Sequence, residues 1–281
     1  MPELDVVLAA KYQQLQAILL EMGSLIIGLS GGVDSVLLAK VAYDVLGERA
    51  LAVTADSASL PRRELRAAQE IAQSIGIRFM TIKTQEVSDP RYAANPVNRC
   101  YYCKYELFSH LDRLVAELGY RWVCYGENED DKADHRPGGQ AAREHQVRAP
   151  LKEAGLTKPE IRTLAQFLGL PVWDKPAFAC LSSRFPYGQA ITPQKLAQVE
   201  AAEELLWELG FRQYRVRHHG EIARLEVGPG DMPKLLAQAA VIVERLRQVG
   251  FTFIPMDLAG YQRGSLNQNV PDLELIPLQV S

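Results

Sequence analysis

Short apolar runs alternate with longer amphipathic segments along the first two thirds of the chain. The run at residues 25–29 is continuous and contains a glycine, which is typical of a short strand buried on both faces. Residues 7–19 instead carry apolar side chains at helical spacing. By the same criteria we expect strands at residues 25–29, 50–54, 78–82 and 122–125, and helices at residues 7–19, 35–46, 62–75 and 104–118.

Strands that alternate with helices of this length form βαβ units with right-handed crossovers, and such units build a parallel sheet. A further helix at residues 157–168 begins with Thr157 and Glu160 at capping-box spacing. We expect it to close a first domain over residues 1–175. The sequence therefore predicts an α/β domain whose ligands bind beyond the carboxyl ends of the strands.

The pattern changes in the last third of the chain. We expect helices at residues 192–209 and 233–249, and strands at residues 214–218, 223–227 and 251–254. The order strand, strand, helix, strand favours a small α+β domain on a mostly antiparallel sheet. We place this domain at residues 176–267. The polar, proline-interrupted stretch at residues 268–281 is expected to be a loosely ordered tail.

Composition excludes several classes of protein. The 281 residues are 47% apolar and 23% charged, which excludes a disordered or fibrous chain. The net charge of -3 counts against nucleic acid as the main ligand. No apolar run reaches the roughly 18 residues of a membrane helix, and the N-terminus lacks the basic start of a signal peptide. We therefore expect a cytoplasmic protein that binds neither membrane nor nucleic acid.

A glycine-rich loop joins the first expected strand to the helix that follows it. The glycines permit a tight turn, and the N–H groups at the helix start attract an anion such as phosphate. On its own, the pair of glycines also fits an ordinary connecting turn. The loop lacks the Lys-Ser/Thr ending of a Walker A motif. Its residues are Ser30, Gly31, Gly32, Val33, Asp34 and Ser35.

This loop resembles the SGGxDS loop of the N-type ATP pyrophosphatases, which split ATP into AMP and pyrophosphate. Residues 125–131 and 156–171 resemble two further segments of that superfamily. The resemblance implies the adenine nucleotide alpha hydrolase-like fold, with ATP and Mg²⁺ as cofactors. It adds Asp56, Asn128 and Asp131 to the nucleotide-binding residues. Asp130 and Asp131 could otherwise be an ordinary solvated loop.

Cys180 is the candidate nucleophile of the second half. It stands among small residues, four positions before Arg184, and a guanidinium nearby would favour the thiolate. A cysteine in such a setting is more often an inert core residue. Chemistry alone leaves both interpretations open.

Four segments together resemble the LarE family of ATP-dependent sacrificial sulfur transferases in nickel-pincer cofactor assembly. The resemblance runs from about residue 5 to residue 265. Its motifs are SGGVDS, NRCYYCK at residues 98–104, GENEDD with Arg136-Pro137-Gly138, and PAFACLSSRFPYG at residues 176–188.

The family resemblance implies a two-stage reaction. A carboxylate of pyridinium-3,5-biscarboxylic acid mononucleotide is adenylated, and Cys180 then forms a thioester and gives up its sulfur to become dehydroalanine. Ser183 and Arg184 accompany Cys180 in this motif as catalytic candidates. The resemblance also implies a homo-oligomer and transfer of the product to other cofactor-assembly proteins.

Cysteines elsewhere carry alternative interpretations. Some relatives hold an iron–sulfur cluster through three cysteines near this segment, but Phe178 and Ser182 stand here, so the sacrificial version is favoured. Cys100 and Cys103 form a CxxC pair whose role stays open between structure, metal binding and redox chemistry. Cys124 lies in an expected strand and is interpreted as a core residue.

A basic strand in the second domain is a candidate phosphate site. Arg215 and Arg217 alternate, so both side chains should lie on one face of the strand, where they suit a substrate phosphate or form an ordinary solvated surface. The family resemblance places a metal site in this domain. It implies Glu203, Glu226 and Asp231 as ligands.

Three other functions remain open on the residues. The chain could be a tRNA-thiolating enzyme of the same superfamily, although its acidic balance counts against RNA binding. It could be an ammonia-dependent synthetase of the NAD- or GMP-synthetase kind, in which Cys180 is structural. It could also be a nucleotide sensor that binds ATP without releasing pyrophosphate.

Overall fold

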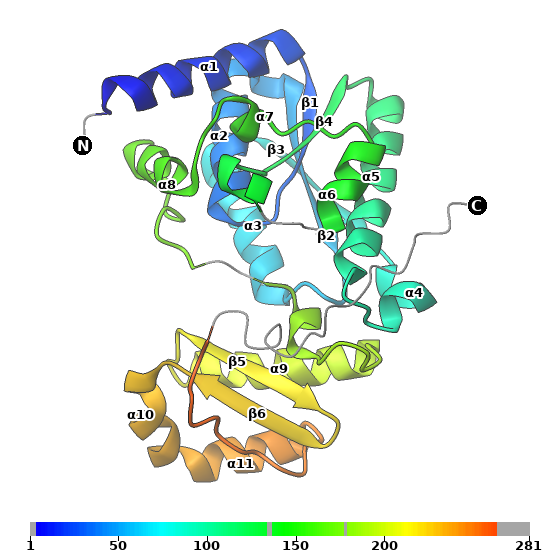
Figure 1. Ribbon diagram of the computed structural model, residues 1–281, viewed down its shortest axis with the longest axis vertical. Coiled ribbons are helices and arrows are strands. Elements are labelled where there is room, and N and C mark those ends of the chain that lie inside the picture. The colour runs from blue at the N-terminus through cyan, green and yellow to red at the C-terminus, as the bar shows by residue number, and fades with distance from the viewer. Residues whose placement is uncertain (1–3, 134–136, 177–178, 263–281) are drawn as a thin grey trace. The chain divides into compact units, whose positions relative to one another are not determined.

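The computed structural model describes residues 4–133, 137–176 and 179–262. The expected tail at residues 268–281 lies outside the described residues, as do Arg136 and Phe178. The chain forms two compact units (Figure 1). Unit 1 comprises Met1–Glu86 and Cys100–Phe178, and unit 2 comprises Val87–Arg99 and Ala179–Ser281.

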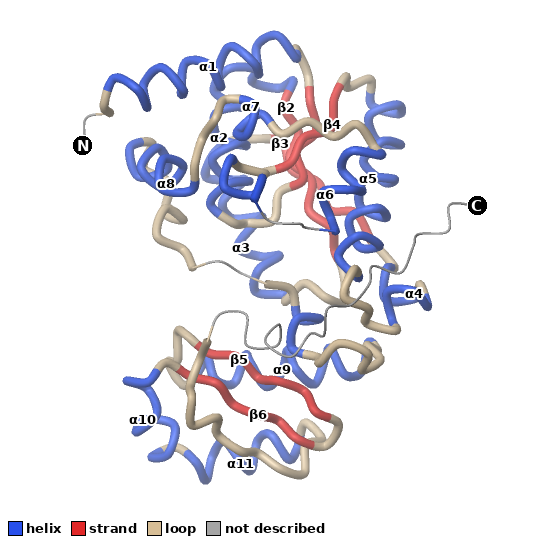
Figure 2. The backbone as a smooth tube through the Cα atoms, in the orientation of Figure 1, coloured by secondary structure: helices blue, strands red, loops and turns tan. Residues whose placement is uncertain are grey.

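Unit 1 is built on a parallel four-stranded sheet. The strands are β1 (Leu25–Gly28), β2 (Ala50–Asp56), β3 (Arg78–Lys83) and β4 (Trp122–Tyr125). Their order in the sheet is β3-β2-β1-β4, and all pairs are parallel (Figure 2). The predicted parallel-sheet fold of the adenine nucleotide alpha hydrolase type is confirmed.

Helices cover both faces of this sheet, so unit 1 has three layers (Figure 1). Inward side chains alternate along the strands: Ile27 packs with one helical layer, whereas Ile26 packs with the other. The first layer contains α1 (Val6–Met22), α2 (Val33–Leu46), α3 (Arg62–Ile75), α7 (Pro150–Glu153) and α8 (Lys158–Phe167). The second layer contains α5 (Arg99–Leu118) and α6 (Pro137–Glu144).

Within unit 1, α8 starts as its sequence predicts. The side chain of Thr157 and that of Glu160 form the reciprocal bonds of a capping box. These bonds satisfy N–H groups that the helix itself cannot pair. The start of α8 is therefore fixed next to the loop that follows β4, where Lys158 N donates to Asp130 Oδ2 over 2.7 Å.

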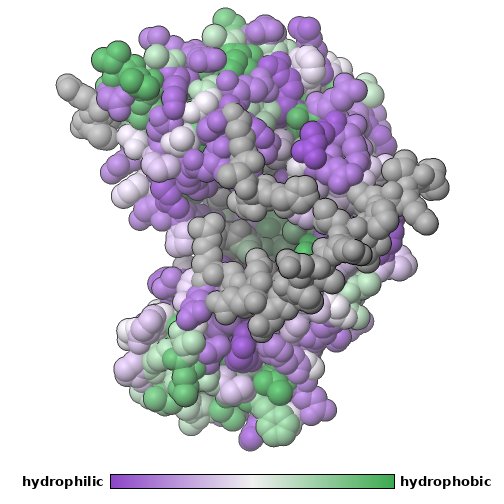
Figure 3. Space-filling view, in the orientation of Figure 1, coloured by the Kyte–Doolittle hydropathy of each residue, from purple (hydrophilic) through white to green (hydrophobic). Residues whose placement is uncertain are grey.

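Unit 2 is an α+β unit that contains an antiparallel hairpin. Its strands are β5 (Tyr214–His219) and β6 (Ile222–Val227), and its helices are α4 (Pro90–Ala93), α9 (Pro193–Glu208), α10 (Met232–Ala237) and α11 (Ala239–Gln248). Apolar side chains gather on the visible face of this unit over α10 and α11 (Figure 3). Leu236 and Val241 are among the exposed ones.

Two predicted elements of unit 2 differ from the structure. The helix expected at residues 233–249 is broken at Gln238, whose N–H reaches the carbonyls of Lys234 and Leu235 and ends α10. The strand expected at residues 251–254 makes only an isolated bridge, between Ile222 and Phe253. Pro255 follows and has no N–H to continue a ladder.

Among the described helices, none combines the length and apolar character that crossing a membrane requires.

Candidate active site

The phosphate loop connects β1 to α2. Gly31 has a φ of 74°, a backbone conformation that favours glycine, and Gly32 begins α2 without a side-chain cap. Ser35 Oγ donates to Gly32 O over 3.0 Å and lies 3.1 Å from Ser30 Oγ. These bonds hold the loop in one conformation and leave the helix start available to an anion.

Gly126 allows the end of β4 to approach this loop closely. A Cβ atom at position 126 would lie 2.7 Å from Ser35 N and 3.0 Å from the main-chain carbon of Asp34. Both are main-chain atoms, which cannot move aside as a flexible side chain could. The glycine is therefore required where the β4 loop meets the start of α2.

Asp34 is the ionisable group of the phosphate loop. Its Oδ2 accepts a hydrogen bond from Lys158 Nζ, whereas its buried Oδ1 has no partner among the described residues. Burial raises the pKa of Asp34, while Lys158 opposes this shift and the Asp131 carboxylate adds to it. Asp34 and Asp131, which the sequence places about 100 residues apart, thus interact electrostatically.

The other predicted nucleotide-binding residues lie in loops after strands. Asn128 N donates to Asp131 Oδ2 over 3.1 Å, and Asn128 Oδ1 accepts from Asp130 N over 3.0 Å, so these side chains fold the loop after β4. Asp56, the last residue of β2, pairs with Arg62 on α3. All of them follow the carboxyl ends of parallel strands, where ligands bind in such sheets.

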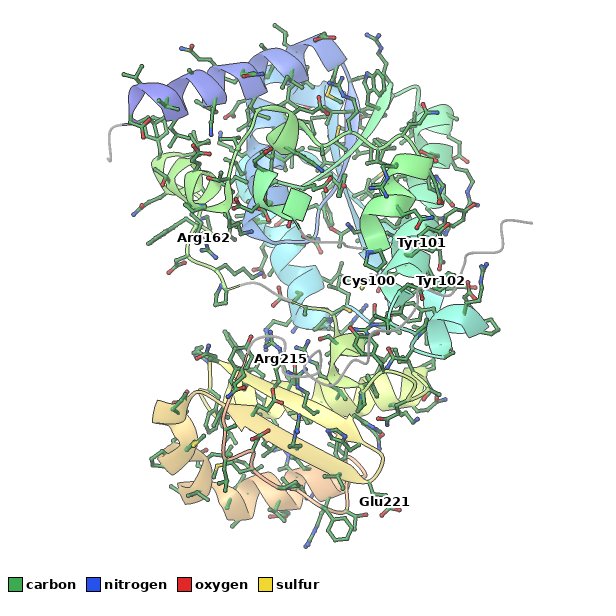
Figure 4. The ribbon with its side chains drawn as sticks, viewed as in Figure 1. Cys100, Tyr101, Tyr102, Arg162, Arg215 and Glu221 are labelled. Carbon is green, nitrogen blue, oxygen red and sulfur yellow. The ribbon has the colours of Figure 1, made fainter. Side chains whose placement is uncertain are left out.

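Lys175 is a residue at this loop that the sequence analysis did not assign. Its Nζ donates to Gly31 O over 3.1 Å and to Glu64 Oε2 over 2.7 Å. The Arg162 guanidinium, labelled in Figure 4, donates to the carbonyls of Trp173 and Lys175 over 2.6 and 2.8 Å. A single lysine in a loop gives no periodic signal, so only the fold shows its place.

In unit 2, Cys180 stands at the start of a short turn, Leu181–Arg184. It is partly exposed, whereas the Arg184 side chain is completely buried. Arg184 Nη1 donates to Ala179 O over 2.7 Å, to Cys180 O over 3.0 Å and to Ser183 Oγ over 2.8 Å. Arg184 therefore fixes the main chain that carries the thiol, a role that differs from the thiolate contact expected from the sequence.

The two carboxylates nearest to this turn bind guanidinium groups. Glu203 accepts from Arg184 Nε and Nη2, both over 2.8 Å, and from Val216 N over 3.0 Å. Glu226 forms an ion pair with Arg217 over 2.8 Å. Burial alone would raise the pKa of Glu203, but Arg184 holds it below its usual range.

The predicted metal ligands Glu203, Glu226 and Asp231 are not brought together. Within the described ranges, no three His, Cys, Asp or Glu side chains come close enough to hold a metal ion. The reason is electrostatic, because the two buried carboxylates neutralise arginines rather than converging on a common point. As they stand, these residues do not fit a metal site.

Arg215 and Arg217 lie on one face of β5, opposite Glu226 and Arg224 of β6. Arg217 is buried and also donates to Ser183 O over 2.8 Å, which links it to the cysteine turn. Arg215, labelled in Figure 4, lies over the Tyr261 ring and pairs with none of the described carboxylates. Burial and the neighbouring Arg184 lower its pKa, as expected where an anion would be favoured.

The remaining cysteines lie in unit 1. Cys100 and Cys103 occupy the first turns of α5, where Figure 4 labels Cys100 beside Tyr101 and Tyr102, and Cys100 is exposed. Cys124 in β4 is fully buried, and burial raises its pKa. Its interpretation as a core residue is confirmed.

Comparison with known proteins assigns the chain to a family. The NAD synthase family model matches residues 10–94. An uncharacterised protein of Synechocystis is 48% identical over 93% of this chain and 98% of its own length. The pyridinium-3,5-bisthiocarboxylic acid mononucleotide synthase of Lactiplantibacillus plantarum is 36% identical over 95% of this chain and 98% of its own length. The chain belongs to the N-type ATP pyrophosphatase family of this synthase.

Membership of the N-type ATP pyrophosphatase family agrees with the phosphate loop described above. The family uses ATP, and its members include more distant enzymes. One is a glutamine-hydrolysing GMP synthase of Archaeoglobus fulgidus, of which the matching polypeptide is 28% identical over 66% of this chain and 65% of its own length. The similarity to the L. plantarum synthase extends over nearly the whole of both chains.

Proposed function

We propose that this chain is an ATP-dependent sulfur transferase that converts pyridinium-3,5-biscarboxylic acid mononucleotide into the thiocarboxylate, with Cys180 as the sulfur donor. The observation that carries the proposal is the partly exposed Cys180 on a turn fixed by a buried arginine. The similarity to a synthase of the bisthiocarboxylic acid mononucleotide, over nearly its full length, supports the choice of substrate.

The first step takes place at the phosphate loop. A substrate carboxylate oxygen attacks the α-phosphorus of ATP, the bond to the β-phosphate oxygen breaks, and pyrophosphate leaves. The N–H groups at the start of α2 and the ammonium groups of Lys158 and Lys175 are suited to the charge on that leaving group.

Asp34 fits a Mg²⁺ ion at this loop. Its buried Oδ1 has no hydrogen-bond partner among the described residues, and a carboxylate oxygen is a preferred Mg²⁺ ligand. Asp131 lies near enough to interact with it electrostatically. The ion would neutralise phosphate charge, and these two carboxylates would hold it.

Cys180 performs the second step. Its thiolate attacks the carbonyl carbon of the acyl adenylate, AMP leaves, and a thioester joins the substrate to the protein. Loss of the Cα proton of residue 180 to a base then forms a Cα=Cβ double bond and expels the sulfur on the substrate as a thiocarboxylate. Residue 180 becomes dehydroalanine, so each chain supplies one sulfur atom.

The basic face of β5 is suited to the substrate's phosphate. Arg215 has no ion pair with a described carboxylate, and Arg217 connects this face to the main chain of Ser183. A phosphate bound beside Arg215 would offset the repulsion between neighbouring guanidinium groups. The substrate would then be held by the unit that carries Cys180.

Cys180→Ala tests the proposal. We expect this variant to fold and to release pyrophosphate from Mg-ATP and the pyridinium dicarboxylate nucleotide, but to form no thiocarboxylate. Thiocarboxylate formation by the variant would exclude Cys180 as donor. Pyrophosphate release that depends on ammonia rather than on this substrate would instead favour a synthetase of the GMP-synthetase kind.

A further inference from the structure

The segment Val87–Arg99 comes from the first half of the sequence but packs against the cysteine turn about 90 residues later. Two main-chain bonds align it with the residues that follow the turn. Gly188 N donates to Asn95 O over 2.9 Å, and Ile191 N donates to Ala93 O over 2.8 Å. The segment is therefore part of the structure that supports Cys180.

Tyr92 makes the contact nearest to the thiol. Its hydroxyl lies 2.6 Å from Ser182 Oγ, two residues after Cys180. Tyr92 is 1% exposed and Ser182 is 0% exposed, so water cannot replace this bond. Because a hydroxyl pair in a dry interior has one favourable geometry, the bond fixes the middle of the turn relative to α4.

Asn95 holds the other end of the same segment in place. It is fully buried with a φ of 55°, a left-handed conformation that Asn tolerates better than most residues. Its Nδ2 donates to Pro186 O over 2.7 Å, and its Oδ1 accepts from Arg99 Nη1 over 2.8 Å. These bonds set the position of the helix that carries Tyr92.

The turn is thus held from two sides. Arg184 binds the carbonyls of Ala179 and Cys180 from the α9 side, and Tyr92 binds Ser182 from the Val87–Arg99 side. Cys180 itself remains partly exposed. This arrangement restricts the main chain while leaving the sulfur accessible, which is what attack on a bound acyl group requires.

We infer that Tyr92 is a positioning residue for sulfur transfer, acting through its hydroxyl bond to Ser182; this inference rests on the function proposed above. Without the bond, the turn has more conformations, so the thiolate spends less time in reach of the acyl carbon. Adenylation uses the phosphate loop of unit 1 and does not involve this bond. Loss of the hydroxyl should therefore slow the second step and leave the first unchanged.

Tyr92→Phe tests this inference in the full-length chain. Mg-ATP and the pyridinium dicarboxylate nucleotide are mixed with enzyme in a single turnover, and pyrophosphate release and dehydroalanine at residue 180 are followed together. We expect pyrophosphate release at the wild-type rate and dehydroalanine formation slowed by about tenfold or more. Equal dehydroalanine rates in variant and wild type would overturn the inference.

Ser182→Ala removes the other partner and serves if Tyr92→Phe folds poorly. We expect Ser182→Ala and the double variant Tyr92→Phe/Ser182→Ala to slow the second step to a similar extent, because all three lack the same bond. Additive effects of the two changes would contradict a shared role. A general loss of structure would reduce both steps together and would equally contradict it.

Tyr43→Phe is the matched control, because it removes a hydroxyl from a tyrosine packed against the core of unit 1. We expect it to leave both rates at wild-type values. If the wild-type protein itself forms no dehydroalanine, the proposed function fails. If the wild type forms it and Tyr92→Phe forms it equally fast, only the inference about Tyr92 fails.

Discussion

Arg184 and Glu203 form a bidentate ion pair in the interior of unit 2, with Nε–Oε1 and Nη2–Oε2 distances of 2.8 Å. The Arg184 side chain has no exposed surface, and the Glu203 side chain is 7% exposed. The same guanidinium binds the carbonyl of Cys180, and the same carboxylate binds Val216 N. The pair thereby connects the cysteine turn to α9 and β5.

Removal of one member of this pair should destabilise the protein strongly. Glu203→Gln leaves the buried guanidinium of Arg184 without a counter-charge, which costs about 3–5 kcal/mol. Urea unfolding would measure the loss. Arg91→Ala, which breaks the exposed pair with Asp89, is the control and should cost less than about 1 kcal/mol. A similarly small loss for Glu203→Gln would contradict this account.

Gly126→Ala should disturb the phosphate loop. The added Cβ would meet Ser35 N at 2.7 Å, so either β4 or the start of α2 has to shift. We expect weaker ATP binding, measured by calorimetry, together with lower stability. Gly139→Ala in α6 is the control, since only the end of the Arg143 side chain lies near its new Cβ. ATP affinity unchanged in Gly126→Ala would show that the close approach is not needed.

Lys158→Gln should change the pH dependence of pyrophosphate release. Burial raises the pKa of Asp34, and Lys158 partly offsets that shift. Without the ammonium group the pKa of Asp34 rises further, so the ionised carboxylate is lost at a higher pH. The acid limb of the pH–rate profile should therefore move to higher pH. Lys11→Gln, which breaks the pair with Glu160, should leave the limb in place.

If the acid limb does not move in Lys158→Gln, Asp34 is not the group that limits the rate at low pH. That result would also remove the support for Asp34 as a ligand of the nucleotide's metal ion.

His218 should make stability depend on pH. It is 1% exposed, and burial lowers its pKa to about 4. Its Nδ1 faces the donors Gln189 Nε2 and Gly220 N, so a proton there has no acceptor. In the unfolded chain it binds a proton near pH 6.5. Between these pH values the unfolded state binds more protons, so the free energy of unfolding should fall as pH falls.

Urea unfolding at several pH values checks this prediction. The slope attributable to His218 approaches about 1.4 kcal/mol per pH unit between pH 6 and 4.5. His218→Gln should reduce the slope in that window, whereas His110→Gln, on the outer face of α5, should retain it. An identical slope in wild type and His218→Gln would show that His218 is not buried in its neutral form.

Much of unit 1 could be predicted from the sequence, because its signals are local. The continuous apolar run at β1, the glycines of the loop and the capping box of α8 each act within a few residues. Their order along the chain then fixes a parallel sheet, and the loops at its carboxyl edge follow from that. The ATP-binding region was therefore predictable in outline.

Unit 2 depended on contacts that the sequence does not show. Nothing local indicates that Tyr92 meets Ser182, or that Glu203 faces Arg184 rather than a metal ion. Buried charged groups take whichever partner the fold supplies, so their pairing cannot be deduced from spacing along the chain. Lys175 belongs to the same class, because its bond to Gly31 O joins residues 144 positions apart.

Intact-protein mass spectrometry before and after incubation with Mg-ATP and the pyridinium dicarboxylate nucleotide tests the central claim most directly. Peptide mapping across Cys180 locates any change. The account predicts that the chain loses one H₂S equivalent, and that the loss is confined to residue 180. An unchanged mass at residue 180, with pyrophosphate released and thiocarboxylate formed, would show that the sulfur comes from elsewhere and would contradict the account.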